Sequence, residues 1–223
     1  YNKSRETLPD EYRSSVKNGY LIGEAGKDQH VLENWCRFFV GREKGQKNGF
    51  FLDQRENRLF LQSFVKDKTV LNAFSYSGGF SVYALMAGAK LVHSVDISQK
   101  AIDWTSQNIE LNPVDASRHE GYTQDVLKFL QASEENYEVM VVDPPAYAKS
   151  MKKRHNAVQG YKRLNKLALQ KIAPGGLLFT FSCSQVIDRT LFYNTIMAAA
   201  IEAKRFVRVM HHLTQPADHP VQL

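Results

Sequence analysis

The residues of this chain that are best suited to ligand chemistry come directly after short apolar runs. A glycine pair that includes Gly78 follows one run, and Asp96, Asp125 and Asp143 each follow another. Such carboxylates accept hydrogen bonds from ribose hydroxyls or from an adenine amino group, and a glycine turn before a helix offers backbone N–H groups to an anion. This set suits an adenosine cofactor that carries an amino acid. Ordinary strand–turn–helix joints with capping acids are the alternative.

These residues need an element order that gathers them at one edge of a sheet. From residue 70 onward, apolar runs alternate with amphipathic runs, which predicts repeated βα units and a Rossmann-like α/β fold with a mostly parallel, doubly wound sheet. Strands are predicted near 70–73, 91–95, 119–123, 137–142, 177–182 and 205–210. Helices are predicted near 79–88, 98–111, 125–132, 156–172 and 189–203, with N-caps at Ser98 and Asp188 and a stop at 174–176.

The part of the chain ahead of this sheet is predicted to carry a small β-hairpin, with strands at 20–22 and 31–40. Asp53 and Glu56 have the spacing of a capping box, which predicts that a helix starts at Asp53. We therefore expect an N-terminal lead-in and hairpin extension over 1–50 and a main domain over 51–223.

The composition indicates a soluble globular chain: of its 223 residues, 43% are hydrophobic and 23% are charged. No apolar run has the length of a membrane span, and no signal peptide is evident. Cys36 and Cys183 lie far apart and have no metal-ligand spacing. We therefore expect no metal site, no membrane association and a reducing, cytoplasmic setting. The oligomeric state stays open, with a homodimer as one option.

The net charge of +6 is concentrated in the segment 144–187, which holds no Asp or Glu. The segment contains eight basic residues: Lys149, Lys152, Lys153, Arg154, Lys162, Arg163, Lys166 and Lys171. A segment with many positive and no negative side chains is suited to binding a polyanion such as nucleic acid. The alternative is a solvated basic face of a helix.

Longer motifs in the chain resemble those of known families. Asp143-Pro144-Pro145, followed closely by an aromatic residue, is similar to the fourth motif of class I S-adenosylmethionine-dependent enzymes that methylate nucleobases. The segments 45–55 (Gly-Gln-Lys-Asn-Gly-Phe-Phe-Leu-Asp-Gln-Arg), 181–184 (Phe-Ser-Cys-Ser) and 217–220 (Ala-Asp-His-Pro) resemble signatures of the PUA-domain-containing large-subunit ribosomal RNA methyltransferases. The best-known members of that family make 5-methylcytosine.

The resemblance covers roughly residues 20–223. It implies a class I methyltransferase fold, S-adenosyl-L-methionine as cofactor and ribosomal RNA as partner. The sequence departs from the family pattern in two ways: no PUA-like domain lies upstream, as expected of a fragment, and the chain ends before the last strand that such a domain usually has.

Cys183 has a clear chemical role if the product is 5-methylcytosine. A thiolate that adds to carbon 6 of a cytosine turns the ring into an enamine, whose carbon 5 can attack a methyl sulfonium. Asp143 can hydrogen-bond the base edge and favour its protonated, activated form. A base must also remove the carbon 5 proton, and the sequence does not identify it. The alternative for Cys183 is a buried core cysteine, which is the role we expect of Cys36.

The other predicted site residues surround these two. The predicted cofactor contacts are Phe51, Asp53, Phe74, Ser75, Tyr76, Gly78, Asp96, Ile97, Asp125, Val126 and Asp143. The predicted substrate contacts are Pro145, Tyr147, Lys149, Lys152, Lys153 and Arg154. Tyr147 can stack on the target base or act as a packing aromatic.

Three rival interpretations remain at this stage. An enzyme with the same fold and cofactor that methylates a purine nitrogen needs no thiol. A nicotinamide dehydrogenase normally carries a Gly-x-Gly-x-x-Gly turn, whereas the loop at 74–80 reads Phe-Ser-Tyr-Ser-Gly-Gly-Phe. A non-catalytic RNA-binding module with the same fold binds cofactor without turnover.

Overall fold

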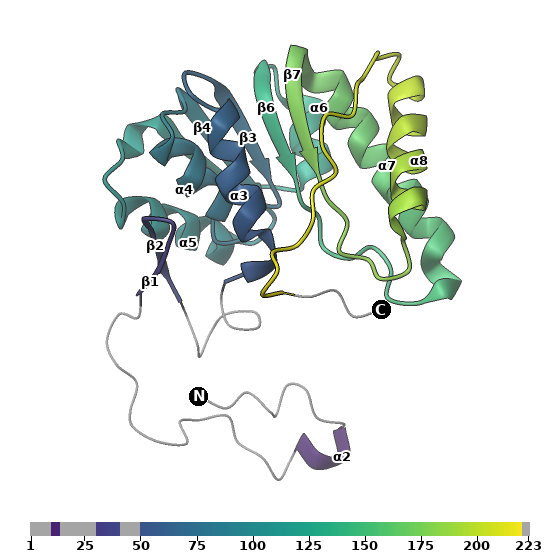
Figure 1. Ribbon diagram of the computed structural model, residues 1–223, viewed down its shortest axis with the longest axis horizontal. Helices are drawn as coiled ribbons and strands as arrows, with labels where there is room; N and C mark the ends of the chain where they lie inside the picture. Colours follow the sequence, from purple (N-terminus) through teal and green to yellow (C-terminus); the bar gives the residue numbers. More distant parts are fainter. Residues whose placement is uncertain (1–9, 14–29, 41–49, 220–223) are drawn as a thin grey trace.

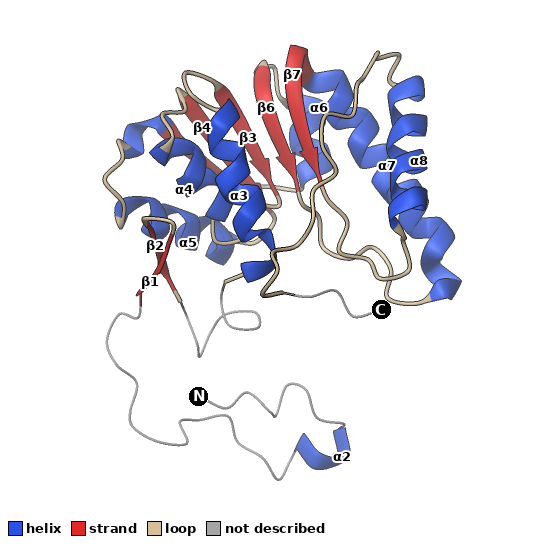
Figure 2. Ribbon diagram, viewed as in Figure 1, coloured by secondary structure: helices blue, strands red, loops and turns tan. Residues whose placement is uncertain are grey.

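A five-stranded parallel sheet forms the centre of the molecule (Figures 1 and 2). The computed structural model describes residues 10–13, 30–40 and 50–219. The strands are β3 (Thr69–Ala73), β4 (Leu91–Asp96), β5 (His119–Thr123), β6 (Tyr137–Val142) and β7 (Ile172–Thr180), in the spatial order β5-β4-β3-β6-β7. Every neighbouring pair is parallel. The order changes direction between β3 and β6, which places the ligand crevice of such a sheet at the carboxyl ends of these strands.

Helices cover both faces of the sheet (Figure 2). They are α3 (Arg55–Leu61), α4 (Gly79–Met86), α5 (Gln99–Glu110), α6 (Val126–Ala132), α7 (Arg154–Lys171) and α8 (Arg189–Glu202). Successive strand residues point to opposite faces, so Val70 and Val139 pack with the α3–α4 side while Leu71 and Met140 pack with α6 and α7. Helix α8 packs mainly on α7, and Leu178 of β7 packs against the same cluster. The predicted doubly wound α/β class is confirmed.

The two predicted N-caps that open long helices are present. The Ser98 side chain accepts a hydrogen bond from the N–H of Ala101, and the Asp188 side chain accepts one from Leu191. The predicted cap at Asp53 is wrong. Asp53 lies inside a short 3-10 helix, η1 (Leu52–Gln54), and α3 follows with Gln54 at its N-cap and no side-chain capping bond.

The hairpin exists, and apart from His30 it lies inside the longer of its two predicted strands, 31–40. It pairs β1 (His30–Glu33) with β2 (Cys36–Phe39) through a two-residue turn. Asn34 and Trp35 in that turn have φ angles of 44° and 72°, as a type I′ turn requires. The other predicted strand, 20–22, lies outside the described residues. Cys36 and Phe38 are fully buried in the same core cluster as α3 and α4, so the hairpin packs as part of the main body.

The C-terminal part departs most from expectation. Helix α7 ends at Lys171, within a residue of its predicted end, but the expected stop segment 174–176 itself lies within β7, where Gly175 has a φ of 77° and the pairing with β6 is irregular. The strand expected at 205–210 is absent from the described chain, which leaves β7 at the edge of the sheet. After α8 the chain instead crosses toward α3 (Figure 1), where His211 packs edge-on against Phe60 at 4.7 Å.

The remaining short elements are α2 (Asp10–Arg13), η2 (Gln62–Phe64), η3 (Ala116–Arg118) and η4 (Met151–Lys153). Of these, only η4 lies beside the candidate site, because it joins the segment after β6 to the start of α7.

Candidate active site

The loop after β3 has a strained backbone at the carboxyl edge of the sheet. Phe74 and Tyr76 have φ angles of 61° and 48°, a region that residues other than glycine rarely occupy. Two hydrogen bonds from its backbone N–H groups hold this loop to the end of β4. The N–H of Ser75 donates to the carbonyl of Val95 (3.0 Å), and the N–H of Tyr76 donates to Oδ2 of Asp96 (3.0 Å). Strain of this kind persists where surrounding contacts over-determine it, and it clusters at ligand sites.

Helix α5 holds the same loop from one side. Oγ1 of Thr105 lies 3.1 Å from the carbonyl oxygen of Tyr76, and Nδ2 of Asn108 donates to the carbonyl of Ser77 (2.7 Å). Gly78 has a φ of 76°, and a Cβ added to it would lie 2.5 Å from Cγ2 of Thr105. Only glycine therefore fits between the loop and α5, and the loop is fixed by packing as well as by hydrogen bonds.

Unpaired polar atoms mark where this loop can meet a ligand. Among the described residues, Oγ of Ser75 and Oδ1 of Asp53 are buried without a hydrogen-bond partner, whereas buried polar groups are usually paired. Phe51, close to Asp53 in sequence, packs edge-on against Tyr76 at 5.1 Å. With the Asp96 carboxylate, this set offers acceptors for hydroxyl and amino groups and a ring surface for a base. The residues present therefore fit S-adenosylmethionine.

Three further predicted cofactor contacts lie after β4 and β5. Ile97 is 75% exposed, so its side chain is open to a ligand. Asp125 is the N-cap of α6, and its Oδ1 accepts from the N–H of Lys128 (3.0 Å), which leaves its second oxygen for another donor. Val126 is buried in the core between the sheet, α6 and α7. Its side chain contributes to packing, and only its backbone can serve a cofactor.

Asp143 lies directly after β6, beside the change in strand order. Its Oδ2 accepts a hydrogen bond from Nε2 of Gln54 (3.2 Å). Burial raises the pKa of Asp143 to about 7, the neighbouring Asp53 carboxylate adds to this rise, and Gln54 and Arg58 oppose it. Both protonation states of Asp143 are therefore populated near neutral pH, as suits a group that exchanges a proton with a substrate.

The structure brings Cys183 next to the segment of Asp143. The N–H of Phe181 donates to the carbonyl of Val142 (3.0 Å), which continues the β6–β7 pairing as far as the strand ends. The Cys183 side chain is exposed, and its thiol lies 3.5 Å from the carbonyl oxygen of Pro144. This exposure rules out the alternative of a buried core cysteine and leaves the thiol accessible to a substrate.

Ser184 anchors the Cys183 loop to the rest of the protein. Its buried hydroxyl lies 3.0 Å from the hydroxyl of Tyr161 on α7 and accepts from the N–H of Ala148 (3.4 Å). Cys36, unlike the exposed Cys183, is fully buried, and burial raises the pKa of its thiol to about 11. A neutral, buried thiol is unreactive, in keeping with the structural role expected of Cys36.

The predicted aromatic substrate contact is also a packing residue. The Tyr147 ring is half-buried, with its centroid 4.7 Å from that of Tyr161. A Cβ on Gly160 would lie 2.9 Å from the Tyr147 ring, so the absence of a side chain there makes room for it. Pro145 is exposed beside it. The structure supports the packing interpretation of Tyr147, and stacking on a base stays a prediction.

The basic block divides into paired and unpaired residues. Arg154 pairs with Asp188 (3.0 Å), and Lys162 and Lys166 both pair with Glu202 of α8 (2.9 and 3.3 Å). Lys171 donates to the carbonyl of Ser133 (2.7 Å). Of the eight basic residues of this block, the exposed ones without an ion pair to another described residue are Lys149, Lys152, Lys153 and Arg163. The phosphate-binding face expected from the sequence is therefore concentrated on the loop before α7.

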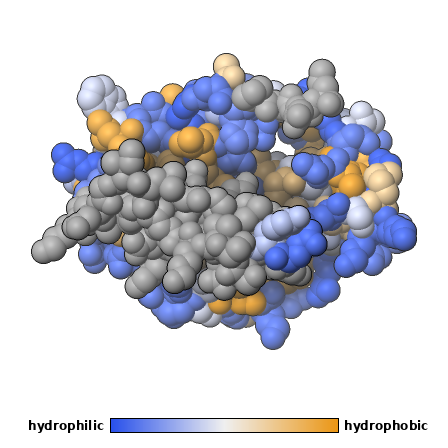
Figure 3. Space-filling view, turned by 90° about the horizontal axis from the view of Figure 1, so that it is seen from below, coloured by the Kyte–Doolittle hydropathy of each residue, from blue (hydrophilic) through white to orange (hydrophobic). Residues whose placement is uncertain are grey.

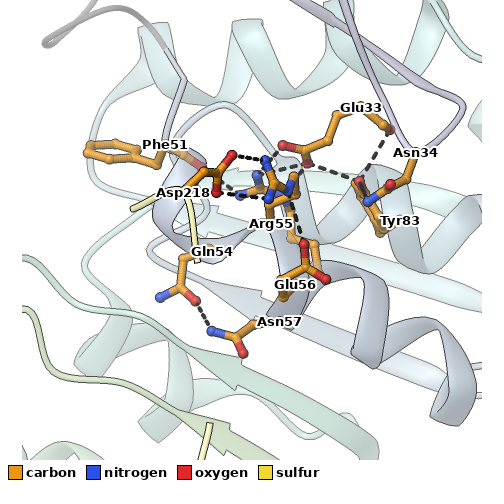
Figure 4. A network of polar contacts seen from close by, with 10 residues as sticks. Glu33, Asn34, Phe51, Gln54, Arg55, Glu56, Asn57, Tyr83 and Asp218 are labelled. Carbon is orange, nitrogen blue, oxygen red and sulfur yellow. Dashed lines mark hydrogen bonds and ion pairs between the residues drawn. The ribbon is translucent and has the colours of Figure 1, made fainter. Parts of the chain in front are cut away.

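A buried ion pair that the sequence did not reveal joins the hairpin to the site (Figure 4). Arg58 makes a bidentate contact with Glu33 of β1 (Nε–Oε1 and Nη2–Oε2, both 2.9 Å) and donates from Nη1 to the carbonyl of Phe51 (2.9 Å). The Tyr83 hydroxyl of α4 also donates to Glu33 (2.9 Å). Both ionic side chains are almost fully buried. This network fixes the position of Phe51 at the edge of the site.

The C-terminal motif closes back onto the same region. Arg55 makes two contacts with the carboxylate of Asp218, at 2.6 and 2.9 Å, although the residues are 163 positions apart (Figure 4). The motif at 217–220 therefore lies beside the end of the motif at 45–55, as far as the described residues extend. No local sequence pattern reveals such a pairing. Figure 3 views the molecule from the side of the strand ends, where the described surface is mostly hydrophilic with scattered hydrophobic residues.

Two searches for other kinds of site gave negative results for the described parts of the chain. No group of three or more His, Cys, Asp or Glu side chains is arranged to hold a metal ion. No helix there has both the length and the apolar character needed to cross a membrane.

Comparison with known proteins agrees with this geometry. The family of S-adenosylmethionine-dependent methyltransferases matches residues 3–221. "Ribosomal RNA large subunit methyltransferase I" of Aeromonas salmonicida (strain A449) is 42% identical over 99% of this chain and 57% of that protein. The protein of the same name from Klebsiella pneumoniae (strain 342) is 44% identical over 99% of this chain and 56% of its own length. The chain thus spans little more than half of these relatives.

Among solved structures, SMU.776 complexed with SAH has a TM-score of 0.82 and 27% identity, covering 95% of this chain and 56% of that one. Trm5b from Pyrococcus abyssi, at 19% identity and a TM-score of 0.62 over 84% of this chain and 52% of that one, shares the fold. The family match spans nearly the whole chain, and the strained loop, the strand-end carboxylates and the sheet order agree with it. The chain belongs to the family of S-adenosylmethionine-dependent methyltransferases.

Proposed function

We propose that this protein methylates a base of large-subunit ribosomal RNA in the cytoplasm, and that the acceptor is carbon 5 of a cytosine activated by Cys183. The observation that carries the proposal is the contact of an exposed thiol with the backbone segment that follows the strand-end residue Asp143. The Cys183 thiol lies 3.5 Å from the carbonyl oxygen of Pro144, the residue after Asp143. The names of the relatives support the choice of ribosomal RNA.

Residues of the β3 loop and of the neighbouring strand ends would hold the cofactor. Asp96 would accept from ribose hydroxyls and Asp125 from an amino group, while Ser75 and Asp53 offer buried polar atoms that have no partner within the described chain. Phe51, Phe74, Tyr76, Gly78, Ile97, Val126 and Asp143 complete the proposed contacts. S-adenosylmethionine bound there supplies an electrophilic methyl group.

Cys183 activates the acceptor. After its proton has left, the thiolate forms a bond to carbon 6 of the cytosine, and the electron pair of the carbon 5–carbon 6 double bond makes carbon 5 nucleophilic. Asp143, with a pKa of about 7, donates a proton or hydrogen bond to the ring edge and stabilises the charge that develops there. Once carbon 5 carries the methyl group and gives up its proton to a base, the double bond re-forms and the sulfur of Cys183 leaves as a thiolate.

The RNA would approach over the loop that follows β6. Pro145 and Tyr147 line its start, and Lys149, Lys152 and Lys153 present exposed ammonium groups. Arg154 stands beside them but shares its charge with Asp188. Phosphate contacts of this kind position a strand without reading its sequence.

Nucleoside analysis tests the proposal against its nearest rival. Ribosomal RNA from cells that lack the protein would be methylated in vitro with the full-length protein and analysed by mass spectrometry. We expect one new 5-methylcytosine with the native protein and none with Cys183→Ser. A methylated purine that still forms with Cys183→Ser would identify the nitrogen-methylating alternative. Cofactor binding without any RNA product would support a non-catalytic module.

A further inference from the structure

We propose that Gln54 and Asn57 are positioning residues that hold the Asp143 carboxyl group in register with the substrate base. The inference rests on the proposed function, because it concerns the same carboxyl group. Neither residue has a role in the chemistry described above. Both belong to the segment that enters α3, which is far in sequence from β6.

The three side chains form a directed chain of hydrogen bonds. Asn57 donates from Nδ2 to Oε1 of Gln54 (2.7 Å), as Figure 4 shows. Gln54 in turn donates from Nε2 to Oδ2 of Asp143 (3.2 Å) across 89 positions of sequence. Because Asn57 occupies the amide oxygen of Gln54, the amide nitrogen must face Asp143. The carboxyl group is thereby held at one oxygen, which leaves Oδ1 as the atom to meet a base.

The placement of Asn57 has no explanation in packing alone. It is 6% exposed in the first turn of α3, where an asparagine has low helix propensity and burial of its amide is costly unless the amide is hydrogen-bonded. Gln54 and Asn57 are three residues apart, so the helical turn sets them side by side. Arg58, the next residue, anchors the same turn to Phe51 and to the hairpin. The turn is therefore a fixed platform for Asp143.

The charges around Asp143 show what the contact does. The carboxylate of Asp53 in η1 repels it, while Arg58 in α3 and the Gln54 amide favour its ionised form. Loss of the Gln54 donor therefore removes one of the two groups that counter burial and repulsion. The pKa of Asp143 should rise further when that donor is lost.

The test measures kcat, KM for RNA and the pH dependence of kcat for full-length Gln54→Leu and Asn57→Leu. Gln62→Leu, eight positions beyond Gln54 on the same helical run, is the matched control. We expect kcat to fall roughly 10–100-fold for Gln54→Leu and less for Asn57→Leu, with little change in KM, as for a misplaced catalytic group. Because the protonated form of Asp143 is the proton donor, the alkaline limb of the profile should move to higher pH. Gln54→Glu, which keeps the shape but loses the donor, should not rescue kcat.

A double-mutant cycle separates loss of the Gln54–Asp143 contact from a general loss of stability in one variant. In an Asp143→Asn background, Gln54→Leu should have little further effect on residual kcat, because the two residues act through one contact. If the two substitutions instead lowered kcat independently, so that their fold-losses multiplied in the double variant, the inference would be overturned. A Gln54→Leu variant with the native kcat and pH profile, alongside an impaired Asp143→Asn variant, would overturn it as well. If Asp143→Asn and Cys183→Ala were both fully active, the proposed function itself would fail instead.

Discussion

The backbone N–H of Tyr76 donates to Oδ2 of Asp96 over 3.0 Å, and this contact ties the loop after β3 to the end of β4. The other oxygen, Oδ1, accepts from the N–H of Ser98 (2.9 Å). The carboxylate is thus oriented from both sides by backbone groups. Each oxygen retains a lone pair, so Asp96 both shapes the loop and offers acceptors to a ligand.

Replacing Asp96 by Ala should weaken S-adenosylmethionine binding by about 1.5–3 kcal/mol, because charge-assisted hydrogen bonds to hydroxyl groups are lost. Isothermal titration calorimetry measures this directly. Glu110→Ala, an exposed acidic residue at the far end of α5, is the control and should bind as the native protein does. Equal affinity in the Asp96 and Glu110 variants would remove Asp96 from the site.

Replacing Gly78 by Ala should destabilise the protein more than replacing Gly175 by Ala. Both glycines have nearly equal φ angles, 76° and 77°, so both substitutions impose left-handed strain of about 1–2 kcal/mol. Only at Gly78 would the new Cβ also meet Thr105, at 2.5 Å, whereas Gly175 has open space around it. We expect an additional loss of about 1–3 kcal/mol at Gly78 in urea unfolding. Equal losses would mean that the Thr105 contact relaxes freely.

The predictions that succeeded from sequence concern local patterns. Strands of a parallel sheet are covered on both faces, so they appear as short apolar runs, and β3 to β6 lie within about a residue of their expected limits. Ser98 and Asp188 cap their helices as their types predict. Gly78 lies at the expected turn, because only glycine tolerates both its φ angle and the nearness of Thr105.

The predictions that failed depend on contacts between distant parts of the chain. Asp53 has the spacing of a cap, yet the fold places it next to Asp143 and makes Gln54 the first residue before α3. The Arg55–Asp218 pair, about which the sequence made no prediction, joins residues that are 163 positions apart. A run rich in β-forming residues at 205–210 predicts a strand, but strand formation needs a neighbour, and the described chain does not place this segment on β7.

Replacing Lys149, Lys152 and Lys153 together by Ala should weaken RNA binding and reduce its dependence on salt. Each lost phosphate contact on single-stranded RNA lowers the slope of log K against log salt by about 0.7, so the triple variant should lose about 2. Lys162→Ala with Lys166→Ala is the matched control, since both lysines already pair with Glu202. Fluorescence anisotropy over a salt series gives the slopes. An unchanged slope in the triple variant would show that the loop is only a solvated surface.

Replacing Asp143 by Asn should stabilise the fold at alkaline pH while it reduces methylation to a low residual rate. The pKa of Asp143 in the fold is about 7, above its ordinary value of 3.8, so the folded state binds the proton more tightly and the native protein loses stability as pH rises through this interval. Asn cannot ionise and escapes this loss. Between about pH 5 and about pH 8, the unfolding free energy of the variant should gain about 1–3 kcal/mol on that of the native protein. A constant difference across this range would show that Asp143 titrates elsewhere.

The covalent adduct on Cys183 is the most direct test of the proposed mechanism. Ribosomal RNA in which cytosine is replaced by 5-fluorocytosine would be incubated with the full-length protein and S-adenosylmethionine. Fluorine cannot leave carbon 5 as a proton does, so the sulfur should stay bonded to carbon 6 after methyl transfer. We expect a protein–RNA species that survives denaturing electrophoresis, with mass spectrometry placing the bond on Cys183 and with no such species from Cys183→Ala. Methylation of normal RNA by Cys183→Ala, or the absence of any adduct from a protein active on normal RNA, would contradict the account.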